Sequence, residues 1–205
     1  MGNNKKHLCP CGSGKRQKLC CRDNALSREP SLTPDEKLAM RREVERLGRA
    51  GQHLEASELL EQLLVLSPRN PLIWNDLGIQ YEAAGLHDRA LDALRQGHRC
   101  DATYPPILYN LGKFTLDRFI RSQKAGELAS KEGHKLLERA ATFLNANLDR
   151  DPGHAEAHYN LALVYLLSSD EARAEAHATI ALRMNQKLEL PSQWLLGSGL
   201  KQLAR

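Results

Sequence analysis

Four of the five cysteines in this 205-residue chain lie within its first 21 residues, at Cys9, Cys11, Cys20 and Cys21. They form two close pairs, which are separated by eight residues that include two glycines. Four thiolates match the ligand set of a tetrahedral structural zinc site. The sequence therefore predicts that these four side chains bind one structural Zn²⁺ ion.

The segment around these cysteines has few side chains with which to form a hydrophobic core. Leu8 and Leu19 are its only sizeable aliphatic residues, and about 25 residues cannot bury enough apolar surface to fold alone. Structural zinc contributes roughly 10–16 kcal/mol in small zinc-finger peptides, so metal binding and local folding would be one event here. A helical turn at Cys20 and Cys21 would bring both thiolates within reach of one ion.

The same segment resembles the SEC-C motif, which forms the zinc-binding tail of the bacterial preprotein-translocating ATPase SecA. The resemblance rests on the run C-P-C-G-S-G-K at residues 9–15, on Lys18 and on the pair Cys20-Cys21. It implies that the four clustered cysteines are the zinc ligands. It also implies that the module they form, residues 1–23, docks on a component of secretion, of the ribosome or of the chaperone system.

Other chemistries are open to these residues. Disulfide bonds would suit an exported protein, but the first seven residues are polar and no apolar signal segment follows them, which favours a reducing cytoplasm. The run from Gly12 to Lys15 lacks the first glycine and the Ser or Thr of a phosphate-binding loop. Iron or another thiophilic ion would fit the same four thiolates as zinc.

The formal net charge of +4 is unevenly distributed along the chain. Residues 1–22 contain six basic residues and no acidic one, namely Lys5, Lys6, Lys15, Arg16, Lys18 and Arg22. This basic docking surface could contact an acidic protein, the ribosome or its RNA, or anionic lipid. Alternatively, the charges only keep a small module in solution. Aromatic side chains on which bases could stack are absent from residues 1–22, which argues against specific recognition of single strands.

Beyond the cysteine-rich segment the chain repeats itself with a period of 34 residues. The matching pairs are Gly51 with Gly85, Ala56 with Ala90, and Leu60 with Leu94. Self-similarity at such a period is typical of solenoids built from stacked helix pairs.

One unit of this repeat, Trp74-x2-Leu77-Gly78-x2-Tyr81, resembles the tetratricopeptide repeat (TPR) pattern. The resemblance implies an all-α solenoid of about four helix pairs. The predicted order is the zinc module at 1–23, a linker at 24–33, repeats at 34–68, 71–104, 105–154 and 155–190, and a C-terminal capping helix at 191–205. The third repeat carries an insertion near 120–135, which either lengthens both of its helices or forms a solvated loop.

Local signals agree with this arrangement. The run from Thr33 to Glu36 is a capping box with Pro34 at the first helical position, and Asn70-Pro71 opens the second repeat in a related way. Small residues are expected where helices approach closely, at Gly78, Ala90, Gly112, Ala162 and Ala174.

In the TPR family the first helices of the repeats line a groove that holds a peptide or a partner helix. The resemblance places the following residues at groove positions: Arg41, Glu45, Arg49, Asn75, Ile79, Glu82, Tyr109, Lys113, Leu116, Tyr159, Leu163 and Leu166. The lysine and arginine set that clamps a C-terminal carboxylate in chaperone-binding members is not reproduced. The groove therefore predicts a protein or peptide partner of another kind.

Residues that could catalyse a reaction do not converge in this sequence, so we expect a protein that is not an enzyme. His154 and His158 have the i, i+4 spacing of a helical metal pair, but the acid of an H-E-x-x-H motif is misplaced. Cys100 is interpreted as a small buried hydrophobic residue. No apolar run is long enough for a membrane span, and the expected location is the cytoplasm.

Two functions fit these features. The first is a zinc-binding TPR adaptor that mediates protein–protein interactions, with links to secretion, chaperones or the ribosome. The second is an RNA- or ribosome-associated factor whose basic zinc module contacts nucleic acid.

Overall fold

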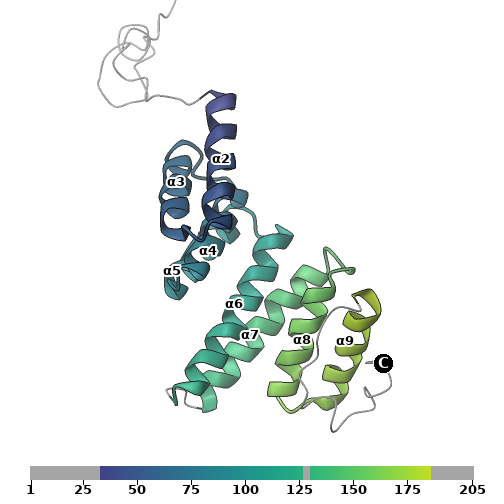
Figure 1. The fold of residues 1–205 in the computed structure, drawn as a ribbon. Helices are drawn as coiled ribbons and strands as arrows, with labels where there is room; N and C mark the ends of the chain where they lie inside the picture. Colours follow the sequence, from purple (N-terminus) through teal and green to yellow (C-terminus); the bar gives the residue numbers. More distant parts are fainter. Residues whose placement is uncertain (1–32, 127–129, 186–205) are drawn as a thin grey trace, which may run out of the picture. The chain divides into compact units, whose positions relative to one another are not determined.

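The structure is a computed structural model that describes residues 33–126 and 130–185. Within these ranges the chain forms eight helices and no strand (Figure 1). The helices are α2 (Pro34–Arg49), α3 (His53–Leu66), α4 (Pro71–Ala83), α5 (His87–Cys100), α6 (Pro105–Lys124), α7 (Ser130–Leu148), α8 (Ala155–Leu167) and α9 (Glu171–Met184). The described part of the chain is therefore all-α, in agreement with the prediction.

The chain divides into two units between Ala39 and Met40. Of the first unit, only residues 33–39 at the start of α2 are described. The predicted zinc module with its four clustered cysteines, the linker as far as residue 32, and the predicted capping helix at 191–205 lie outside the described residues. Those predictions stay predictions.

Two helices begin with the caps that the sequence predicts. The Thr33 backbone N–H donates to Glu36 Oε2 at 2.7 Å, and the Glu36 N–H donates to Thr33 Oγ1 at 3.2 Å. At the start of α4 the side chain of Asn70 accepts from the Leu72 N–H at 3.0 Å, and Pro71 occupies the first helical position. Both predicted caps are confirmed, and each satisfies N–H groups that the helix itself leaves without partners.

The turn inside each of the four helix pairs contains a residue in the left-handed region, which in the α6–α7 turn is Gly126 with a φ of 70°. Gly51 and Gly85, which are one repeat apart, have φ values of 76° and 78°. In both turns the following residue donates its N–H back across the helix end, from Gln52 to Leu47 O and from Leu86 to Tyr81 O. Glycine adopts this conformation without steric cost. In the α8–α9 turn the same position is Ser169, with a φ of 59°.

Close approach of the helices depends on glycines in their interiors. A Cβ atom on Gly78 would lie 2.8 Å from Leu94 Cγ, and one on Gly112 would lie 2.6 Å from Leu144 Cγ. Both glycines lie in the first helix of a pair, facing a leucine of the second. The predicted role of these two residues in close packing is thereby confirmed.

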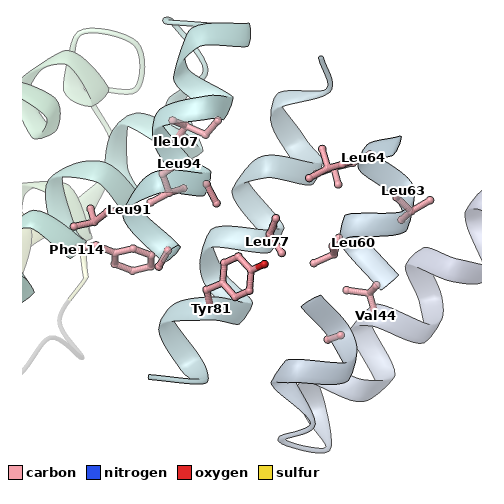
Figure 2. Packing of buried hydrophobic residues seen from close by; sticks show 14 of the residues in the cluster. Val44, Leu60, Leu63, Leu64, Leu77, Tyr81, Leu91, Leu94, Ile107 and Phe114 are labelled. Carbon is pink, nitrogen blue, oxygen red and sulfur yellow. The ribbon is translucent and has the colours of Figure 1, made fainter. Parts of the chain in front are cut away.

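A cluster of buried aliphatic and aromatic side chains joins α2 to α6. Figure 2 shows a row of these side chains that runs from Val44 through Leu60 and Leu77 to Leu94. Leu60 and Leu94 are 1% and 0% exposed. The leucines that recur with the 34-residue period thus fill the space between consecutive helices.

The third helix pair is longer than the others. α6 has 20 residues and α7 has 19, whereas α4 and α8 have 13 each. The inserted residues extend both helices, apart from the turn that begins at Ala125 and the undescribed residues 127–129. A second buried cluster surrounds this pair and includes Leu116, Leu144 and Leu161.

Candidate protein-binding groove

The first helices of the helix pairs contact one another directly. α4 packs against α6, and α6 packs against α8, in addition to their contacts with the second helices. Side chains that point away from the second helices therefore share a surface that continues from one pair to the next. We describe this surface from α2 to α8.

A cavity of about 280 Å³ opens between α2 and α4. We call it the α2–α4 pocket. Its apolar walls come from Val44, Leu60, Leu72 and Ile79. Its polar lining consists of Arg41, Glu45, Asp76 and Gln80. An apolar cavity with a few placed polar groups is the usual form of a binding site.

Asp76 is the most enclosed charged group of this pocket. Its carboxylate lies 3.5 Å from Asn75 Nδ2, at the outer limit of a hydrogen bond. Burial raises the pKa of Asp76, and the hydrogen bond from Asn75 and the charge of Arg41 oppose this increase. Glu45, by contrast, lies at the rim, where its Oε2 is 3.4 Å from Arg49 in an exposed ion pair.

The adjoining surface between α4 and α6 is fixed by an ion-pair network. Glu82 Oε1 lies 2.9 Å from Arg121 Nη1 and 3.0 Å from His87 Nδ1, and the Glu82 side chain is 16% exposed. Arg121 belongs to α6, so this pair joins two first helices. Its partial burial makes the pair stronger than an ordinary surface ion pair.

Further along, α6 and α8 meet through polar and aromatic side chains. The Asn160 side-chain amide donates to the Tyr109 hydroxyl at 3.3 Å, and the Tyr109 ring lies 4.4 Å from the ring of His154. Burial raises the pKa of Tyr109. On the same helix Lys113 Nζ lies 2.8 Å from Asp117, so the charge of this predicted groove residue is already paired.

Two stretches of the chain, residues 41–105 and 132–189, match the family model described as tetratricopeptide repeat. Together they make up more than half of the 205 residues. The chain belongs to the tetratricopeptide repeat family. The prediction of TPR repeats is thereby confirmed.

One curated relative is similar over part of the TPR region. The chain is 31% identical over 121 residues to the TPR repeat-containing protein YpiA of Bacillus subtilis (strain 168), over 59% of this chain and 25% of YpiA. The chain therefore spans about a quarter of the length of this relative.

Solved structures show the same fold at low sequence identity. TTC0263, a TPR protein of Thermus thermophilus, has a TM-score of 0.65 and 21% identity, over 82% of this chain and 86% of that one. PilF of Pseudomonas aeruginosa has a TM-score of 0.65 and 19% identity, over 82% of this chain and 72% of that one. These likenesses establish the TPR fold. None of the helices in the described ranges is long and apolar enough to cross a membrane.

Most of the predicted groove residues lie at least partly on the surface of these TPR helices. Arg41, Glu45 and Ile79 line the α2–α4 pocket, and Ile79 is 39% exposed. Arg49 is exposed beside them. The partly buried members are Glu82, Tyr109, Lys113, Tyr159, Leu163 and Leu166.

Two of the predicted groove residues are buried instead, and the prediction is corrected for them. Asn75 is 5% exposed, because its side-chain oxygen accepts a hydrogen bond from Asn110 Nδ2 at 2.8 Å between α4 and α6. Leu116 is 1% exposed, because it belongs to the cluster that α6 forms with α7 and α8. Neither side chain is available to a partner.

Two residues that line the pocket, Asp76 and Gln80, were not predicted from the sequence. Asp76 directly follows Asn75, and one residue along a helix turns the side chain by about 100°. The groove position carried over from the repeat pattern therefore falls on Asn75, which faces inward, and not on Asp76, which faces the pocket. The charge of Asp76 could have identified it as a pocket residue from the sequence, because an aspartate next to a buried helical position has to face a polar environment.

The structure also describes the histidines and the cysteine that the sequence analysis considers as reactive side chains. His154 occupies the N-cap position of α8 without a capping hydrogen bond from its side chain, and His158 is buried. Within the described residues no group of three or more His, Cys, Asp or Glu side chains could hold a metal ion. The interpretation of Cys100 as a buried residue is wrong, because it is exposed at the last residue of α5, where no further turn covers it.

Proposed function

We propose that this TPR protein is an adaptor that holds a protein or peptide on the surface of its first helices. The observation that supports this proposal is the α2–α4 pocket, which combines apolar walls with a half-buried carboxylate on a surface continuous with α6 and α8. TPR proteins generally act as interaction scaffolds rather than as enzymes, and the groups that line this pocket include no nucleophile beside a base.

The proposal is tested by photocrosslinking in cells. A photoreactive benzoylphenylalanine placed at Ile79, which borders the pocket and is 39% exposed, should form a discrete protein adduct. The same residue placed at Glu58, which is exposed on α3 and does not line the pocket, is the matched control. An adduct pattern that is identical at both positions would contradict groove binding.

We further propose that residues 1–23 form a zinc module that gives the adaptor a second contact surface, in the reducing environment of the cytoplasm. The four clustered cysteines would hold one zinc ion, and the ion would order a segment that has no core of its own. The six basic residues of this segment would then lie on one small module and favour an acidic partner surface.

Elemental analysis of the reduced, purified full-length protein tests this site. We expect about one zinc ion per chain, lost when Cys20 and Cys21 are both replaced by serine. Far-UV circular dichroism should change little, because α2–α9 have their own buried clusters. Cys100→Ser is the matched control, since Cys100 is exposed at the end of α5, and it should keep the zinc. Metal-free wild-type protein would refute the proposal.

A second candidate function, contact with RNA, is favoured by the six basic and no acidic residues in 1–22. Binding to a ribosomal RNA fragment would then weaken steeply with salt concentration, and the steepness would fall when Lys15, Arg16 and Lys18 are replaced by glutamine. Binding that is insensitive to both changes would exclude this function in favour of a protein partner.

A further inference from the structure

We infer that the α2–α4 pocket accepts an aliphatic side chain that ends in a cation, a lysine or an arginine of the bound peptide. This inference rests on the proposed function and specifies the chemistry of the partner. It requires that the apolar walls, the charges and the size of the pocket all fit such a side chain.

The charges that line the pocket favour a cation over an anion. Glu45 and Asp76 are the two acids and Arg41 is the one base among the lining residues, so the lining carries a net charge of −1. An acidic ligand would have to place its own charge near the half-buried carboxylate of Asp76. Glu45 is already in an exposed ion pair with Arg49 at the rim, so the acid that a basic ligand would meet inside the pocket is Asp76.

The state of Asp76 adds a reason for a hydrogen-bond donor at this point. The carboxylate is half-buried, and burial is the largest influence on its pKa, which it raises. Its contact with Asn75 Nδ2 is long, at 3.5 Å. A purely aliphatic ligand would cover this carboxylate and strip away its water without supplying a donor, which is costly. An ammonium or guanidinium group supplies the donor and the opposite charge together.

The walls and the volume of the pocket fit the rest of such a side chain. Val44 and Leu60 are 6% and 1% exposed and form a closed apolar floor, while Ile79 forms an exposed edge. Lysine and arginine bury their methylene stems against surfaces of this kind and keep the charged end near polar groups. About 280 Å³ is below the range of most small-molecule pockets, which suits one side chain rather than a whole ligand.

The experiment uses nonapeptide pools with a fixed central residue and random flanks, measured by fluorescence anisotropy against the full-length protein. The fixed residue is lysine, arginine, norleucine or glutamate. We expect the lysine or arginine pool to bind about tenfold more tightly than the norleucine pool, which has the stem without the charge. The comparison of lysine with arginine identifies which cation the pocket takes.

The variant Asp76→Asn keeps the shape of the side chain and removes its charge. This variant should bind the lysine or arginine pool at most about twofold more tightly than the norleucine pool. The exposed control Glu58→Gln should keep the full preference for the basic pool. Circular dichroism confirms that both variants are folded. If the norleucine pool binds as tightly as the lysine pool, or if Asp76→Asn keeps the preference, the inference is wrong.

Crosslinking separates this failure from failure of the proposed function. Pools that bind without charge preference and still crosslink to benzoylphenylalanine at Ile79 would support groove binding. They would overturn only the inference that the pocket takes a cationic side chain. Pools that neither bind nor crosslink at Ile79 would overturn both. Tight binding of the glutamate pool would show that the pocket prefers an anion, and it would overturn the inference of a cation.

Discussion

Single residues in this protein owe their identity to the atoms that face them. Gly97 in α5 is an example, because a Cβ atom there would lie 2.4 Å from Ile107 Cδ1 and 2.8 Å from Trp74 Cβ. The buried Asn147 is another, since it donates to the Pro105 carbonyl at 2.9 Å and lies 2.8 Å from His154 Nδ1. Each of them joins three helices or helix ends at one point.

Replacing Gly97 with alanine should destabilise the protein by about 1–3 kcal/mol, the usual cost of overpacking. In an unhindered helix the same change is favourable by roughly 0.5–1 kcal/mol, so the sign of the effect reports the contact. Urea unfolding followed by circular dichroism measures it. Gly48→Ala is the comparison, because its nearest neighbour is the flexible end of Gln80 at 3.3 Å, and it should cost less. Equal costs for the two variants would refute this account.

The sequence could predict Gly78 and Gly112 as close-packing positions but not Gly97 or Asn147. The first two occupy a recognisable position in the repeat, next to Leu77 and Leu111. The contacts of the other two cross between helix pairs and depend on how those pairs meet. The pattern of one pair therefore contains no signal for them.

At the scale of helices, α8 and α9 are joined by two histidines. His158 Nδ1 and His177 Nδ1 lie 2.9 Å apart, and His158 Nε2 lies 3.3 Å from the Pro152 carbonyl. A carbonyl only accepts, so Nε2 of His158 carries a proton and its Nδ1 accepts from His177. The His177 ring stacks on Tyr165, over which the Arg173 guanidinium also lies.

This arrangement predicts a loss of stability in mild acid. Burial, then the charges of His158 and Arg173, lower the pKa of His177. A histidine with a lowered pKa in the folded state contributes stability that is present above the unfolded pKa of about 6.5 and lost as the pH falls through it. The urea midpoint should therefore fall more between about pH 7.5 and 5.5 in the wild type than in His177→Phe. The exposed His134→Gln should behave like the wild type, and identical pH profiles for all three would exclude the effect.

The lengths of α6 and α7 could not be predicted from the sequence. The insertion near 120–135 contains both charges and glycines, which suit a solvated loop and a solvated helix equally well. The structure continues α6 as far as Lys124 and begins α7 at Ser130. Phe119 and Leu137 are 6% and 4% exposed. Their burial explains why the insertion lengthens the helices instead of forming a loop, because it requires helices on both sides of the turn.

At the scale of the whole described chain, the extensive contacts connect only helices that are one or two places apart in sequence. A perturbation should therefore spread to neighbouring helices before it reaches distant ones. Ala178 in α9 is 0% exposed, so Ala178→Gly removes buried contacts and loosens the helix. Hydrogen exchange should accelerate in α8 and α9 and change little in α4 and α5. Uniform acceleration in all helices would mean that the array unfolds as one unit.

α6 is the helix that belongs to both buried clusters. Ile107, Leu111 and Phe114 complete the cluster that begins in α2, while Leu116 and Phe119 belong to the one shared with α7 and α8. Hydrolysis of a single peptide bond in the turn between Cys100 and Pro105 would therefore produce two fragments with complementary apolar surfaces. Such halves would be expected to find each other and reassemble without a covalent link, as a split reporter requires.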